Sequence, residues 1–107
     1  MATHRAGEQN GKYYTYLLHF TLPLAHASHY MGMARDVMAR WRAHDSGAGA
    51  RICRSARLSG AQLVIAHIWE HPDRKEASKH EKRLKREHHL ARHCPICRAH
   101  AIVAKYM

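Results

Sequence analysis

Residues 13–33 of this chain read YYTYLLHFTLPLAHASHYMGM, and this stretch decides the fold that the sequence predicts. Tyr13–Phe20 is rich in aromatic and branched side chains, a composition typical of β-strands. We interpret Thr21–His26, which contains Pro23, as a connection. His29–Met33 reads as a second short strand, and its closeness along the chain predicts antiparallel pairing with the first.

The first strand is expected to have two different faces. Successive side chains of a strand point to opposite sides, so Tyr14, Tyr16 and Leu18 share one face. Thr15, Leu17 and His19 face the opposite side.

The segment after these strands predicts a helix and a third strand. Asp36 suits an N-cap, and Val37–His44 has the spacing of a helix. The two glycines of residues 46–49 end it. We interpret Arg51–Arg57 as a basic connector. The apolar run Gln62–Trp69 predicts a buried strand because of its length and its Val and Ile content.

The last predicted helix is also the longest. Asp73 opens it, with Glu76 at capping-box spacing, and it is expected to end near residues 90–91. Residues 101–104 add a short element. The order β-β-α-β-α predicts an α+β fold, in which helices flank a small three-stranded antiparallel sheet.

The length of the chain and its lack of long apolar runs predict a single domain outside the membrane. With 107 residues the chain is expected to form one domain at 13–92, between a tail at 1–12 and a Cys/His-containing tail at 93–107. No apolar run approaches the roughly 20 residues of a membrane span. The polar N-terminus shows no secretory signal, which favours a cytoplasmic protein.

An excess of positive charge points to a polyanionic partner. Eighteen Lys and Arg against eight Asp and Glu give a net charge of +10, which favours nucleic acid over a membrane surface. The side chains expected to follow a phosphate backbone are Arg51, Arg54, Arg57, Lys82 and Lys85.

Five side chains together suit the cleavage of a phosphodiester bond. They are Tyr16, Tyr30, Arg40, His44 and Glu81. A guanidinium can hold a phosphate, an imidazole can move a proton, and a carboxylate can bind Mg²⁺ or Mn²⁺. Each also has an ordinary role: the tyrosines can pack in a sheet, and Glu81 can pair with Lys85 at i,i+4. From spacing alone, the Glu81–Lys85 pair is the favoured interpretation.

The order of these motifs resembles that of the GIY-YIG nuclease superfamily over roughly Tyr13–Arg86. Tyr14-Thr15-Tyr16 stands at the first tripeptide and Tyr30-Met31-Gly32 at the second. The helix with Arg40 and His44 follows, and the segment around Glu81 closes the match. The first tripeptide lacks Gly and Ile, and the spacing between the tripeptides is slightly long.

The resemblance implies roles for the five side chains. Tyr16 matches the proposed general base, and Tyr30 would orient water or phosphate. Arg40 would stabilise the pentavalent phosphorus, and His44 would assist proton transfer or contact the phosphate. Glu81 would bind the single divalent ion. The implied function is a metal-dependent endonuclease acting on DNA, selective for structure or of low sequence specificity.

The C-terminal tail contains half of a zinc-binding pattern. Cys94 and Cys97 form a Cys-x₂-Cys pair, which supplies two of the four ligands of a structural Zn²⁺. His93 and His100, or else Cys53 or another histidine across the fold, would complete the site. A redox-active pair and free thiols are the alternatives.

Two further classes of function remain open on the sequence alone. A nucleic-acid-binding module without activity would bind DNA in a salt-sensitive way and cleave nothing. A zinc-stabilised interaction adaptor would bind metal but not nucleic acid.

Overall fold

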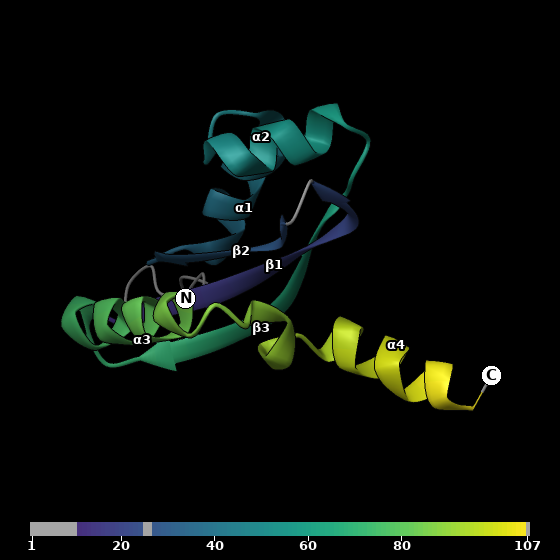
Figure 1. Ribbon diagram of the computed structural model, residues 1–107. Helices are drawn as coiled ribbons and strands as arrows, with labels where there is room; N and C mark the ends of the chain where they lie inside the picture. The colour runs from purple at the N-terminus through teal and green to yellow at the C-terminus, as the bar shows by residue number, and fades with distance from the viewer. Residues whose placement is uncertain (1–10, 25–26, 107) are drawn as a thin grey trace, which may run out of the picture.

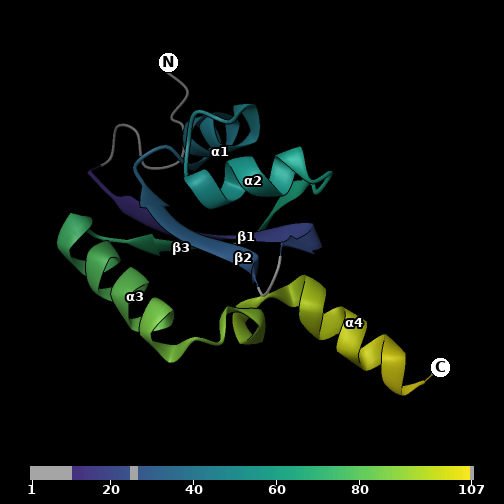
Figure 2. The same ribbon diagram turned by 45° about the horizontal axis from the view of Figure 1, so that its top comes forward.

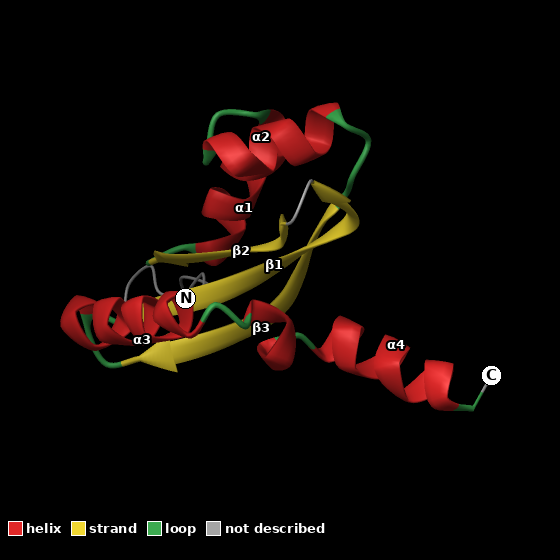
Figure 3. Ribbon diagram, viewed as in Figure 1, coloured by secondary structure: helices red, strands yellow, loops and turns green. Residues whose placement is uncertain are grey.

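The computed structural model describes residues 11–24 and 27–106, and it confirms the predicted α+β class (Figures 1 and 3). Strands β1 (Tyr13–Leu24), β2 (Ala27–Ala34) and β3 (Leu63–His71) form an antiparallel sheet of order β2-β1-β3. Most of the predicted N-terminal tail, and residues 25 and 26 of the predicted connection, lie outside the described residues.

Helices cover the two faces of this sheet. Along the described chain the helices are α1 (Val37–Ser46), α2 (Arg51–Leu58), α3 (Arg74–Glu87) and α4 (Pro95–Lys105), with a 3₁₀ turn, η1 (Leu90–His93), before α4. Figure 1 shows α1 and α2 on one side of the sheet and α3 on the other. Figure 2 shows α4 extending away from the sheet. None of the described helices is long and apolar enough to cross a bilayer.

The two faces of β1 carry separate hydrophobic cores, as the alternation predicts. On the tyrosine face, Tyr14, Tyr16, Leu18 and Phe20 pack against α1 and α2. On the opposite face, which we call the histidine face because His19 lies on it, Leu17 and Met31 pack against α3 and the start of α4. The residues that α3, η1 and the start of α4 contribute to this core are Leu84, Leu90, Cys94, Ile96 and Cys97.

The first strand is longer than predicted, and the interpretation of residues 21–24 as a connection is wrong. The Thr21 amide donates to the Gln62 carbonyl at 3.1 Å, and the Thr21 hydroxyl accepts from the Gln62 amide at 2.8 Å. These bonds continue the strand. Pro23 is tolerated because it lies beyond the last β1–β3 pair, Phe20 with Leu63, where no donor is required.

The basic connector predicted at Arg51–Arg57 is also wrong, because this segment forms α2. Cys53 and Ala56 lie three residues apart and are both fully buried, which gives the helix an apolar side against the sheet. The three arginines dominate the sequence pattern, but they lie on the exposed sides of the helix. The burial of Cys53 and Ala56 is therefore what favours a helix here.

The C-terminal third differs from the prediction in where its helices begin and end. Helix α3 begins after Asp73, whose carboxylate accepts from the Glu76 amide at 2.9 Å, as the capping spacing predicts. It ends at Glu87, earlier than predicted, because His88 adopts a left-handed conformation with φ 57°. The short element predicted at 101–104 is part of the longer helix α4.

Candidate active site and metal-binding residues

Helix α1 places His44 against the tyrosine face of the sheet. Asp36 caps this helix by accepting from the Ala39 amide at 3.0 Å, as predicted. The helix ends at Gly47, whose φ of 90° is left-handed. The amides of Ala48 and Gly49 both return to the Ala43 carbonyl, so the chain turns tightly around His44. The imidazole is fully buried as a result.

Tyr16 and His44 form the centre of the site. The Tyr16 hydroxyl lies 2.7 Å from Nε2 of His44, and both residues are fully buried. The Ala50 amide donates to Nδ1 of His44 at 2.9 Å. An amide can only donate, so Nδ1 must accept and the proton of the neutral ring stays on Nε2. His44 therefore donates to the Tyr16 oxygen, and the Tyr16 proton is free to point elsewhere.

Two glycines make this close packing possible. Gly32 lies opposite Tyr16 in the β1–β2 register. A Cβ at Gly32 would lie 2.5 Å from the Tyr16 hydroxyl oxygen and 2.6 Å from Cζ. A Cβ at Gly49 would lie 2.9 Å from Cα of His44. Any larger side chain at either position would displace the phenol or the imidazole.

Burial and the charge of Arg40 both shift the pKa values of Tyr16 and His44. Burial, followed by Tyr30, raises the pKa of Tyr16, and the Arg40 charge opposes that rise. Burial and then Arg40 lower the pKa of His44, which keeps the ring neutral near pH 7. The free site thus holds a protonated phenol against a neutral imidazole, with an exposed guanidinium beside them.

Tyr30 joins the same group from the neighbouring strand. Its ring centroid lies 5.0 Å from that of His44 and 6.3 Å from that of Tyr16. Burial and then Cys53 raise the pKa of Tyr30, Arg40 opposes that rise, and the charge of Glu81 adds a smaller increase. Tyr30 therefore links the tyrosine face to the carboxylate on α3.

Glu81 lies on α3 next to the outer strand β2, which α3 contacts. Ala77 and Leu84 are buried on the same helix, and the Glu81 side chain is only 18% exposed. Its carboxylate lies 3.4 Å from Nζ of Lys85, so the predicted i,i+4 pair does form. Lys85 in turn lies 6.0 Å from the centre of the Tyr30 ring.

The donor set of Glu81 fits a hard divalent cation. Mg²⁺ usually takes only one or two carboxylates and completes its shell with waters and substrate phosphate. A single carboxylate, 18% exposed and close enough to Tyr30 to affect its pKa, meets that requirement. Tyr16, Tyr30 and His44 pack together on the tyrosine face, with Arg40 beside them. Glu81 approaches this group from α3, next to the edge strand β2 that carries Tyr30.

The five basic candidates do not form one surface. Arg51 and Arg54 are exposed on α2, whereas Arg57 donates to the Ala61 carbonyl at 3.1 Å and pairs with Asp45 at 3.2 Å. On α3, Lys82 lines a hollow of about 550 Å³. Its other lining residues are Arg74, Lys75, Ser78 and Lys79. Arg57 thus has a structural role that the sequence did not indicate.

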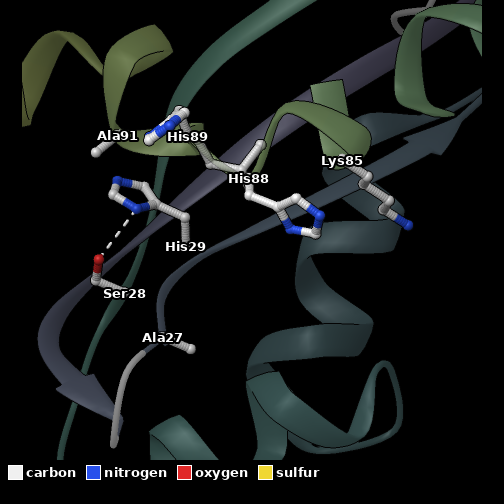
Figure 4. Close-up of a pocket in the computed structure, with 8 residues that line it drawn as sticks. Ala27, Ser28, His29, Lys85, His88, His89 and Ala91 are labelled. Carbon is white, nitrogen blue, oxygen red and sulfur yellow. Dashed lines mark hydrogen bonds between the residues drawn. The ribbon is translucent and has the colours of Figure 1, made fainter. Parts of the chain in front are cut away.

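A second hollow lies between the start of β2 and the end of α3. It has a volume of about 370 Å³, and its lining includes Ser28, His29, Lys85 and His88 (Figure 4). Lys85 therefore borders both this hollow and the Glu81 carboxylate.

The cysteine pair meets histidines that the motif itself does not contain. Among the described residues, one group of Cys, His, Asp and Glu is arranged to hold a metal, and it consists of His19, His29, Cys94 and Cys97. His93 instead lies 3.1 Å from Glu87, His100 is exposed on α4, and Cys53 is buried on the tyrosine face. The register shifts between the His19–His29 pair and the Leu24–Ala27 pair, so counting residues along the hairpin does not predict that these two histidines are opposed.

Comparison with known proteins identifies the family of this chain. Searches among curated proteins and among solved structures returned no significant match to this chain. A family model described as the GIY-YIG catalytic domain matches residues 12–92, which include all five candidate side chains. This chain therefore belongs to the GIY-YIG family, and its catalytic domain is that of a nuclease.

Proposed function

We propose that this protein is a divalent-metal-dependent endonuclease that hydrolyses DNA phosphodiester bonds. The observation that carries the proposal is the buried contact from the Ala50 amide through His44 to the Tyr16 oxygen. A packing role for Tyr16 would need no hydrogen-bond donor of fixed direction. A phenol that must carry negative charge during a reaction does need one.

In this mechanism, Tyr16 is the general base. Tyr16 first releases its phenolic proton to solvent. As the phenolate, it takes a proton from the attacking water, whose oxygen bonds to phosphorus while the bond to the leaving oxygen breaks, and the leaving oxygen takes a proton from solvent. The Nε2 proton of His44 stabilises the phenolate, and the guanidinium of Arg40 stabilises both the phenolate and the phosphate oxygens. Glu81 would hold the divalent ion, which would supply further positive charge at the phosphate.

Tyr30 is better suited to positioning than to proton transfer. The proton on Nε2 of His44 points at the Tyr16 oxygen, 2.7 Å away, so the phenolate that this donor can stabilise is that of Tyr16 rather than that of Tyr30. Its ring packs edge-on against His44, so it can hold the imidazole while its hydroxyl orients a water or a phosphate oxygen.

The test is cleavage of supercoiled plasmid, branched DNA and single-stranded RNA with Mg²⁺ or Mn²⁺. We expect Glu81→Gln and Tyr16→Phe each to lower the DNA cleavage rate by at least about 100-fold. The matched control is Glu76→Gln, which changes an exposed acid on the same helix and should cleave at the wild-type rate. Equal rates in all four proteins would refute the proposed site.

A chain that binds DNA without cleaving it under either metal would instead be a binding module. Binding is measured in the same samples by anisotropy of labelled DNA, so loss of cleavage and loss of binding are separated. Preferential cleavage of RNA would overturn the choice of DNA as substrate while leaving the five side chains in their roles.

A further inference from the structure

On the histidine face, the start of α4 meets the β1–β2 hairpin. His19 and His29 are directly opposed in the register of these two antiparallel strands. Cys94 and Cys97 begin α4, more than 60 residues further along the chain. We propose that these four side chains bind one structural Zn²⁺ ion.

The distances among the four ligand atoms match a tetrahedral site. With Zn–S bonds of about 2.3 Å and Zn–N bonds of about 2.05 Å, a regular tetrahedron has N–S edges of about 3.5 Å and an N–N edge of about 3.3 Å. The two nitrogens, Nδ1 of His19 and Nε2 of His29, lie 3.3 Å apart.

The sulfur–nitrogen distances agree equally well. Sγ of Cys94 lies 3.5 Å from Nδ1 of His19, and Sγ of Cys97 lies 3.6 Å from the same nitrogen. Sγ of Cys97 lies 3.4 Å from Nε2 of His29. All four ligand atoms lie within 4.8 Å of one another. Four of the six edges of the polyhedron are thus within about 0.1 Å of their tetrahedral values.

Neighbouring groups orient these ligands in the way that metal sites require. The Ser28 hydroxyl lies 3.1 Å from Nδ1 of His29, as Figure 4 shows, which allows Nδ1–H to donate and leaves Nε2 free to bind metal. The Cys97 amide points at Sγ of Cys94 at 3.5 Å, and Cys94 is the N-cap of α4. A thiolate at that position is stabilised by the amide and by the positive end of the helix.

The chemistry of the four ligands favours zinc over a hard cation and over a redox-active cysteine pair. Two thiolates and two imidazoles in tetrahedral arrangement are the ligands that Zn²⁺ prefers, whereas Mg²⁺ and Ca²⁺ require oxygen. The two cysteines are free thiols, and a redox pair would have no use for two histidines placed at ligand distance.

A zinc ion here would attach the C-terminal segment to the sheet. Helix α4 buries none of its own residues, so packing along its length contributes little to its position. The core on the histidine face does reach Leu90 and Ile96 on either side of Cys94. The ion would therefore stabilise this core from the face opposite Tyr16, independently of catalysis.

Metal analysis of the full chain, purified under reducing conditions after expression with zinc, tests the proposal. We expect one Zn per chain, and Co²⁺ substitution should give the intense visible bands of a tetrahedral S₂N₂ site. The variants His29→Ala and Cys97→Ser should lose the metal. His100→Ala, an exposed histidine on the same helix, and Cys53→Ala, a cysteine in the other core, should retain it.

A conservative exchange separates metal binding from a general loss of folding. His29→Cys keeps a zinc ligand in place and should retain one Zn per chain with a red-shifted Co²⁺ spectrum, whereas His29→Ala should not. Less than about 0.1 Zn in the wild type, or full zinc content in His29→Ala, would overturn the proposal. Retained Mg²⁺-dependent cleavage in a zinc-free variant would leave the proposed nuclease site unaffected.

Discussion

At the scale of single residues, the orientation of His44 comes from the backbone. In catalytic triads a carboxylate orients the imidazole, whereas the Ala50 amide orients that of His44 by donating to Nδ1 at 2.9 Å. The amide cannot accept a proton, so protonation of His44 at Nδ1 would break the bond. The site is therefore built for a neutral imidazole that donates to Tyr16.

This arrangement predicts a pH dependence of stability. The pKa of His44 is lowered from 6.5 by burial and by Arg40, so the unfolded chain takes up the proton first as the pH falls. The stabilisation by neutral His44 is complete above the unfolded-state pKa of 6.5. It decreases as the pH falls from 6.5 to the lower pKa that His44 has in the folded state. Tyr16 and Tyr30, which face the ring from β1 and β2, remain neutral throughout this range.

The prediction is measured by thermal melting between pH 7.5 and pH 5. We expect the melting temperature of the wild type to fall more steeply than that of His44→Gln, whose side chain does not titrate. Other histidines titrate equally in both proteins, so the difference between the curves isolates His44. Parallel curves would show that His44 does not couple protonation to folding.

At the scale of elements, α3 carries Glu81 and depends on its cap. The Asp73 carboxylate accepts from the Glu76 amide at 2.9 Å, and removing it by Asp73→Ala is expected to cost about 1 kcal/mol of unfolding free energy. For a domain of this size that lowers the melting temperature by roughly 4–8 °C. Asp73→Ser keeps an acceptor and should melt near the wild type. An equal loss in both variants would rule out capping as the cause.

Two elements show why local pattern was not enough. The three arginines of residues 51–57 predict a basic connector, but the segment forms helix α2 because Cys53 and Ala56 are buried against the tyrosine face. Strand β1 continues past Phe20 because Thr21 finds partners on Gln62, 41 residues away. In both cases a tertiary contact supplied the free energy that the local sequence did not show.

At the scale of the whole molecule, the net charge of +10 predicts salt-sensitive binding of nucleic acid. The hollow on α3 gathers Arg74, Lys75, Lys79 and Lys82. Each phosphate contact contributes about 0.9 to the slope of log Kobs against log salt. We expect the double variant Lys79→Ala, Lys82→Ala to lower this slope by about 1–2, as measured by anisotropy from low to moderate salt.

Arg57→Ala is the control for the salt-dependence experiment, because it also removes a positive charge, but from α2. Because Arg57 pairs with Asp45 and donates to Ala61, its loss should lower the melting temperature and leave the salt slope nearly unchanged. A larger change of slope for Arg57→Ala than for the α3 variant would place the phosphate contacts on α2 instead.

The sequence by itself determined the fold class, the three strands, the faces of β1, the caps of α1 and α3, and the five side chains around the site. These follow from periodicity, capping and an ordered set of motifs, which act over a few residues or keep their order along the chain. Only the tertiary structure decided which groups touch. The contact of Tyr16 with His44 spans 28 residues, and that of His19 with Cys94 spans 75. Pairing over such distances depends on strand register and helix packing, which no local pattern contains.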